Sequence, residues 1–238
     1  MTMTFTLSRR LAAEALGTGL LVATVVGSGI MAARLADGNV ALALLGNTLA
    51  TGAILAVLIL ALAPISGAHL NPAVSLVLAL CGALPWRELG AYVLAQSLGG
   101  CVGTLAAHAM FDLPLWALGT TARTGPAQWF AEFIATSGLL VAILAIARFR
   151  TETLPYAVGL YITAAYWFTA STSFANPAVT LARTLTPTFA GIAPADAPAF
   201  VAAQLIGALA ALALTRWLLD GQRPVEASGR AGEPAAVP

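Results

Sequence analysis

Six long apolar stretches occupy most of this chain and restrict the folds that it can adopt. They cover residues 11–33, 41–63, 89–110, 129–149, 155–171 and 198–219. A helix needs roughly 20 mostly apolar residues to cross a bilayer, and these stretches are close to that length. Charged residues make up only 9% of the chain, whereas soluble domains carry about 25%. The sequence therefore predicts an all-α membrane protein with six transmembrane helices.

One tripeptide occurs twice and interrupts this pattern. Its copies are Asn71-Pro72-Ala73 and Asn176-Pro177-Ala178, each placed after a short turn-like run. Asn is a good N-cap because its side chain accepts hydrogen bonds from free N–H groups, and Pro suits the first helical position. We therefore predict two re-entrant half-helices, over 71–81 and 176–186. At 1.5 Å per residue each is roughly 16 Å long, about half of the hydrocarbon layer.

The chain divides into two related halves. An Ala-Glu-x-x-x-Thr pattern surrounds both Glu14 and Glu132, and an Ala-Gln pair recurs at Gln96 and Gln204. Three spans per half make the second half enter the membrane with the opposite polarity, which is an inverted repeat. The expected parts are a first repeat over 9–110, a linker over 111–127, a second repeat over 128–220 and a flexible cytoplasmic tail over 221–238.

Arginine placement predicts the orientation, because cytoplasmic loops carry an excess of positive charge. If the N-terminus is cytoplasmic, the inner side receives Arg9, Arg10, Arg87, Arg148, Arg150, Arg216, Arg223 and Arg230, and the outer side receives Arg34, Arg123 and Arg183. This distribution favours both termini in the cytoplasm. The arginines are scattered and the chain has no Lys, so we expect no nucleic-acid partner.

Two half-helices that enter from opposite faces would meet end to end near the membrane midplane. Each N-terminus carries roughly half a positive charge, so a cation at the meeting point is opposed from both sides. The Asn71 and Asn176 amides can donate hydrogen bonds to a neutral oxygen. Irregular backbone is tolerated at this depth where it lines a polar cavity. The carbonyl groups expected to line it belong to the runs around Gly67, Ala68, His69, Phe174 and Ala175.

The paired tripeptides, the Ser-Gly-Ala-His-Leu run before the first and the matched Glu and Gln positions resemble the major intrinsic protein family, the aquaporins and aquaglyceroporins, over about residues 9–220. The resemblance implies a homotetramer in the cell membrane, the inner membrane for a bacterial protein, with one passive pore per subunit. It also implies that Glu14 and Glu132 are structural carboxylates that accept hydrogen bonds from the re-entrant loops. We recognise no catalytic set, metal-ligand cluster or cofactor motif in the sequence.

The chain departs from this family immediately after the second tripeptide. Most members have Arg there, whereas this chain has Val179. Family spacing assigns the other positions of the narrow zone to Thr51, Ala164 and Ser173, with Tyr166 in place of Ala164 if the assignment slips by two residues. Small residues and Val leave a wider opening. We therefore expect passage of water and of glycerol- and urea-like solutes.

Neutral arsenic and other metalloid acids are further candidate solutes. A second motif with Val resembles channels encoded beside bacterial arsenic-resistance genes, and arsenous acid is uncharged and similar in shape to glycerol. Arg183, one helical turn beyond Val179, has two interpretations: a displaced arginine at the vestibule, or a helix-end arginine at the membrane surface. A water-selective pore and a secondary active transporter remain alternative functions, since broken helices in inverted repeats also build transporters.

Overall fold

The computed structural model describes residues 5–219, and the regular structure in this range is entirely helical. The elements are α1 (Leu7–Leu35), α2 (Val40–Ser66), α3 (Pro72–Leu80), α4 (Trp86–Met110), α5 (Pro126–Phe149), the 3₁₀ turn η1 (Thr151–Thr153), α6 (Leu154–Phe168), α7 (Pro177–Arg183) and α8 (Ala197–Leu219). The predicted tail over 221–238 lies outside the described residues, as do Arg223 and Arg230.

Five of the helices are long and apolar enough to cross a membrane: α1, α2, α4, α5 and α8, with 23 to 29 residues. The sixth expected span, over 155–171, is shorter in the structure, because α6 has 15 residues. Pro155 fixes its first turn, and the backbone at Thr169 is extended rather than helical. At 1.5 Å per residue α6 measures roughly 22 Å, after which the chain enters the second re-entrant loop.

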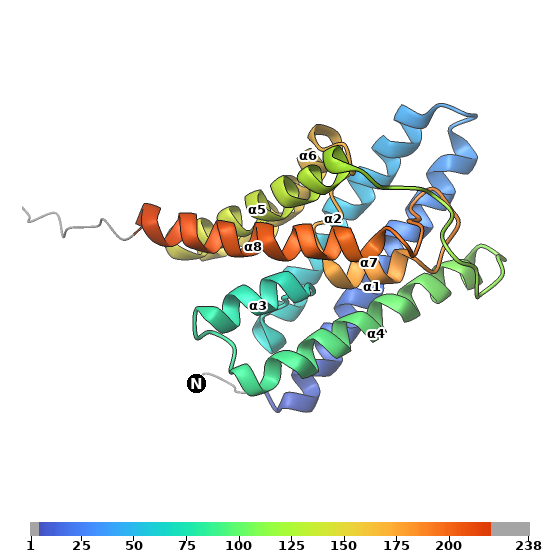
Figure 1. Ribbon diagram of the computed structural model, residues 1–238. Coiled ribbons are helices and arrows are strands. Elements are labelled where there is room, and N and C mark those ends of the chain that lie inside the picture. Colours follow the sequence, from blue (N-terminus) through green and yellow to red (C-terminus); the bar gives the residue numbers. More distant parts are fainter. Residues whose placement is uncertain (1–4, 220–238) are drawn as a thin grey trace, which may run out of the picture.

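The two halves of the chain use the same packing scheme. Helix α1 packs against α4 and α2 in the first half, and α5 packs against α8 and α6 in the second. In Figure 1 the long helices α1 and α4 run side by side, as do α5 and α8, and the short helices α3 and α7 lie between α4 and α8. This correspondence of α1–α4 with α5–α8 is the arrangement expected of a repeat.

The half-helices start where the sequence predicts them, at Pro72 and Pro177. Helix α3 ends close to its predicted end, but α7 stops at Arg183, three residues before the expected 186. At its end the hydrogen bonds span three residues instead of four, from Thr184 N to Leu181 O and from Leu185 N to Ala182 O. The helix ends early because its final carbonyls bond to other loops: Arg183 O accepts from Ile192 N, and Thr184 O accepts from Gly119 N.

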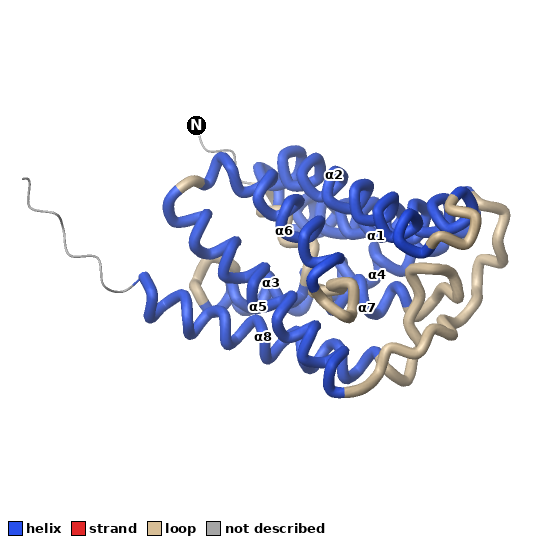
Figure 2. The backbone as a smooth tube through the Cα atoms, turned by 90° about the horizontal axis from the view of Figure 1, so that it is seen from above, coloured by secondary structure: helices blue, strands red, loops and turns tan. Residues whose placement is uncertain are grey.

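The longer loops gather at one end of the bundle, as Figure 2 shows. There the linker between the halves lies against the segment that follows α7, through the bonds Gly119 N to Thr184 O at 2.7 Å and Ala193 N to Thr121 O at 2.8 Å. Large apolar side chains such as Leu98, Val102 and Ile206 are exposed on the helices. Polar residues such as Glu14 and Glu132 are fully buried, so the described chain has an apolar outside suited to lipid.

Gly99 on α4 permits a close contact with α1, which generates a test of the packing. A Cβ built on Gly99 would lie 2.7 Å from both the carbonyl carbon and the Cα of Ala15 on α1, whereas one on Gly90 of the same helix would meet no atom within 4 Å. We expect Gly99→Ala to destabilise the protein by about 1–3 kcal/mol, the usual range for overpacking. Thermal unfolding in detergent should show a lower Tm for Gly99→Ala than for Gly90→Ala, and equal values would contradict the close crossing.

Candidate functional site

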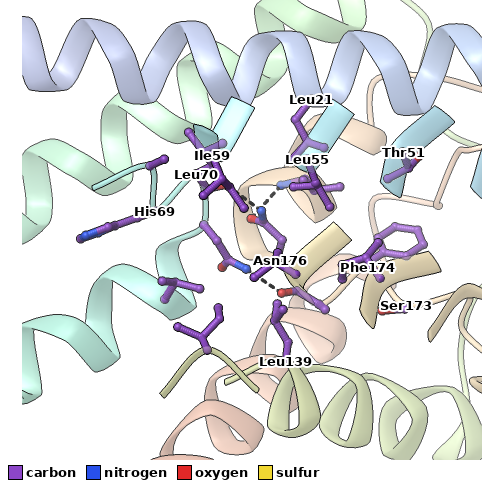
Figure 3. Close-up of a pocket in the computed structure, with 18 of the residues that line it drawn as sticks. Leu21, Thr51, Leu55, Ile59, His69, Leu70, Leu139, Ser173, Phe174 and Asn176 are labelled. Carbon is purple, nitrogen blue, oxygen red and sulfur yellow. Dashed lines mark hydrogen bonds between the residues drawn. The ribbon is translucent and has the colours of Figure 1, made fainter. Parts of the chain in front are cut away.

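One elongated cavity of about 160 Å³ runs along the inside of the bundle. It follows α6 from Leu154 to Tyr166, a path of roughly 18 Å along the helix axis. Both re-entrant loops and both Asn residues of the tripeptides contribute to its wall. Figure 3 shows Asn176 near its middle, with Leu55 and Ile59 of α2 on one side and Leu139 of α5 on another.

Each tripeptide Asn caps its own half-helix and binds the opposite loop. Asn71 Oδ1 accepts from Ala73 N at 2.9 Å, and Asn176 Oδ1 accepts from Ala178 N at 2.9 Å. Asn71 Nδ2 donates to Ala175 O, and Asn176 Nδ2 donates to Leu70 O, both at 2.8 Å. The two halves are therefore joined reciprocally. An amide nitrogen carries two hydrogens, so each Asn keeps one donor that is not used in this bond.

A buried carboxylate holds each re-entrant loop. Glu14 Oε1 accepts from Ser66 Oγ at 2.6 Å and His69 N at 3.0 Å, while its Oε2 accepts from Leu70 N at 2.7 Å. In the second half, Glu132 accepts from Phe174 N and Ala175 N, both at 2.9 Å. The loop N–H groups that lack a helical partner thus donate to these carboxylates, on the side of the loop away from the cavity.

Two glutamines hold these carboxylates in place. Gln96 Nε2 donates to Glu14 Oε2 at 2.8 Å and to Ser75 Oγ at 2.9 Å. Gln204 Nε2 repeats this with Glu132 Oε2 at 2.6 Å and Thr180 Oγ1 at 2.8 Å. Each set links two long helices, a half-helix and a loop, so the cavity wall is fixed to the bundle in both halves.

The loop backbone has left-handed conformations that ordinary residues seldom adopt. The φ angles are 46° at Ala68, 50° at Leu70, 50° at Ser173 and 49° at Ala175. Such non-glycine residues cost of order 1–3 kcal/mol each and persist where their surroundings fix them, which the two carboxylates do here. Residues 67–71 and 173–176 line the cavity. The His69 ring points away from Asn176 (Figure 3), and its Nδ1 lies 3.0 Å from Ser75 Oγ.

Three of the four expected narrow-zone residues line the cavity, and the fourth does not. Thr51, Ser173 and Val179 are buried in its wall. Ala164 is exposed on the outer face of α6, so its assignment is wrong. Tyr166, the alternative, is buried in the wall, and its hydroxyl donates to Thr51 Oγ1 at 3.4 Å. Two residues turn a helix by about 200°, which moves a side chain to the opposite face.

Two arginines, Arg183 and Arg123, lie near the end of the cavity that contains Tyr166. The sequence indicated a possible pore position for Arg183 but no contact for Arg123. Arg183 is only 1% exposed and lines the cavity, so it is not a helix-end residue on the membrane surface. Arg123 lies in the linker, and sequence reasoning assigned it no contact. It donates from Nε to Gly191 O at 2.9 Å and from Nη1 to Ser171 O at 3.2 Å, which ties the linker to the loops before and after α7. A linker position carries no local signal of such contacts.

The cavity wall is polar on some sides and apolar on others. The re-entrant loops and the Asn amides present polar groups, whereas α2, α5 and α6 contribute aliphatic side chains. These aliphatic residues include Leu55, Ile59, Leu139, Ile143, Val158 and Ile162. Such a lining can hydrogen-bond a small polar molecule along one side while its carbon atoms face the other. A charged ion would lose its hydration against the aliphatic wall without a compensating partner.

Comparison with known proteins places these features in a family. A family model described as "Major intrinsic protein" matches residues 1–154. The chain is 62% identical to "Aquaglyceroporin AqpS" of Rhizobium meliloti (strain 1021) over 221 residues, which cover 93% of this chain and 94% of that protein. It is 37% identical to "Aquaporin NIP2-1" of Zea mays over 149 residues, covering 59% of this chain and 50% of that one. The crystal structure of the aquaglyceroporin from Plasmodium falciparum matches with a TM-score of 0.71 at 23% identity, covering 88% of this chain and 95% of that one.

Replacing the Glu14 carboxylate tests how the first loop is held. In Glu14→Gln one acceptor oxygen becomes an amide donor, which leaves at least one buried loop N–H or hydroxyl without a partner. An unsatisfied buried group costs about 1–3 kcal/mol, so the Tm in detergent should fall. Glu152→Gln is the matched control because Glu152 is exposed on η1. If both variants unfold at the wild-type temperature, the carboxylate does not stabilise the loop.

Proposed function

The chain belongs to the major intrinsic protein family, and we propose that its cavity is a passive pore for water and small uncharged solutes of the size of glycerol and urea. The observation that supports this most directly is the meeting of Asn71 and Asn176 inside one elongated cavity. Their half-helices direct two positive ends to the same place, which opposes cations, and the amides offer donors to a neutral oxygen.

The residues that line the outer part of the cavity favour the passage of solutes larger than water. Thr51 and Ser173 are small, and Val179 stands where most members of the family have Arg, so no guanidinium projects from that position. The similarity to a protein named as an aquaglyceroporin supports the same solute class. Tyr166 narrows one side, which keeps a water-selective pore as the alternative. Neutral metalloid acids such as arsenous acid fit this pore because they are uncharged and similar in size to glycerol.

The proposal places the protein in a bacterial cell membrane as a multi-pass homotetramer with both termini in the cytoplasm. Five long apolar helices and the exposed leucines, valines and isoleucines support the membrane location. A rhizobial relative supports a bacterial inner membrane, and the arginine distribution supports the orientation. As a channel the protein performs no chemical conversion and needs no cofactor.

Flux measurements in proteoliposomes separate a channel from a secondary active transporter. We expect the rates for water, glycerol, urea and arsenous acid to rise linearly with the gradient, without dependence on proton or sodium gradients. Empty liposomes are the control. A solute flux that saturates and depends on an ion gradient would indicate a transporter instead of a channel. Conduction of water alone would favour the water-selective pore.

Tyr166 provides a test of pore width. Tyr166→Ala removes a ring from the cavity wall, so we expect the ratio of glycerol to water permeability to rise about twofold or more. Ala164→Leu changes an exposed residue on the other face of α6 and should leave this ratio unchanged. Stopped-flow light scattering on matched proteoliposomes measures both permeabilities. A change in the ratio for Ala164→Leu alone would reverse the assignment.

A further inference from the structure

The guanidinium of Arg183 is buried at the outer end of the cavity without a carboxylate partner. The salt bridge found within residues 5–219 is elsewhere: it joins Arg10, near the start of α1, to Glu88 at 2.8 Å. Arg183 instead donates from Nε to the backbone carbonyl of Ala190, and its Cζ lies 3.4 Å from the centroid of the Phe174 ring. A buried charge is normally paired, because transferring it out of water is costly. The absence of a carboxylate therefore indicates a role other than an ion pair.

One end of this guanidinium is unpaired at the cavity wall. Arg183 Nη1 is buried and has no hydrogen-bond partner, and Arg183 belongs to the cavity wall. Ser173 Oγ, also in the wall, is likewise buried without a partner. Leaving such donors unsatisfied costs about 1–3 kcal/mol for a neutral group and more for a charged one. A solute oxygen that reached either group would satisfy it.

The position of Arg183 on α7 explains how it reaches this place. It follows Val179 by four residues, so both side chains lie on the same face of the helix, one turn apart. Thr51 and Tyr166 line the same end of the cavity, and their hydroxyls lie 3.4 Å apart. The narrow zone thus has an apolar wall at Val179 and a cationic donor one turn further along, instead of a donor at position 179.

We propose that Arg183 is a specificity-determining residue of the pore, which favours uncharged solutes with a carbonyl or oxo oxygen over solutes with hydroxyl groups only. A guanidinium is a donor without acceptor capacity, and Ser173 in the same cavity wall offers a further hydroxyl donor. A carbonyl oxygen only accepts hydrogen bonds, whereas each hydroxyl of a polyol also brings a donor hydrogen that the guanidinium cannot accept. The positive charge also excludes small cations at this end. This inference rests on the proposed channel function.

Arg123 has a positioning role in the same cluster. Its Cζ lies 5.1 Å from the centroid of the Phe174 ring, and its bonds to Gly191 O and Ser171 O anchor it between the outer loops. It is not among the residues that line the cavity. Arg123 therefore holds the ring against which the Arg183 guanidinium rests and does not itself meet the solute.

Selectivity ratios test the proposal, because a purely structural role would lower all fluxes together. In proteoliposomes, Arg183→Met should lower the urea-to-glycerol permeability ratio at least about threefold, since it removes a charged hydrogen-bond donor. It should also make the vesicles permeable to methylammonium, which the wild type excludes. Arg183→Lys keeps the charge but not the planar donor pair, so it should still exclude methylammonium while the ratio falls.

A control and a rescue variant complete the experiment. Arg34→Met is the matched control, because Arg34 is exposed, donates to Phe111 O at 3.2 Å and has its Cζ 5.2 Å from the Phe111 ring centroid. It should retain the wild-type ratio. Adding Val179→Arg to Arg183→Met should restore methylammonium exclusion by placing a charge one turn away.

An unchanged ratio together with methylammonium exclusion in Arg183→Met would overturn the inference, as would a proportional loss of all fluxes. If Arg183→Met does not fold, the ratio in Arg183→Lys decides, and an unchanged value overturns the inference. Wild-type protein that conducts neither urea nor glycerol would instead overturn the proposed function.

Discussion

Backbone N–H groups in the middle of a membrane bundle need partners, and the two re-entrant loops have none within a helix. Glu14 and Glu132 supply these partners, each binding two consecutive loop N–H groups. Their positions depend in turn on Gln96 and Gln204. With the N–H groups bound from behind, the loops can hold left-handed conformations and form the polar side of the cavity. The polar lining therefore depends on two carboxylates, Glu14 and Glu132, that do not themselves line the cavity.

The sequence predicted best those features that depend on neighbouring residues. An Asn followed by Pro specifies a helix start through capping and a fixed φ angle, and both half-helices begin there. The end of α7 was harder to predict. Pro187 is a local stop signal, but the helix ends at Arg183, where its last carbonyl and that of Thr184 bond to segments distant in the chain. Such tertiary contacts leave no pattern in the neighbouring sequence.

The orientation of α6 about its axis shows a second limit. Apolar side chains occur on all faces of α6, because one face packs in the bundle and the other suits contact with lipid. The sequence therefore does not indicate which face points inward. The assignment of Ala164 rested on family spacing, with Tyr166 as the alternative, and the packing against α2 and α5 places Tyr166 inside. Arg123 was missed for a related reason, since its partners come from loops brought together by the fold. The sequence could predict the cavity, whereas the structure was needed to identify the residues around Tyr166 at one end of it.

The reciprocal bonds of Asn71 with Ala175 and of Asn176 with Leu70 have a consequence for biogenesis. During synthesis the first half of the chain emerges before the second exists. At that stage Asn71 Nδ2 and Leu70 O lack the partners that they have in the finished protein. The centre of the conduit is thus completed only when α7 arrives opposite α3. A partly synthesised chain has no completed passage, so the membrane stays sealed until translation has supplied both halves.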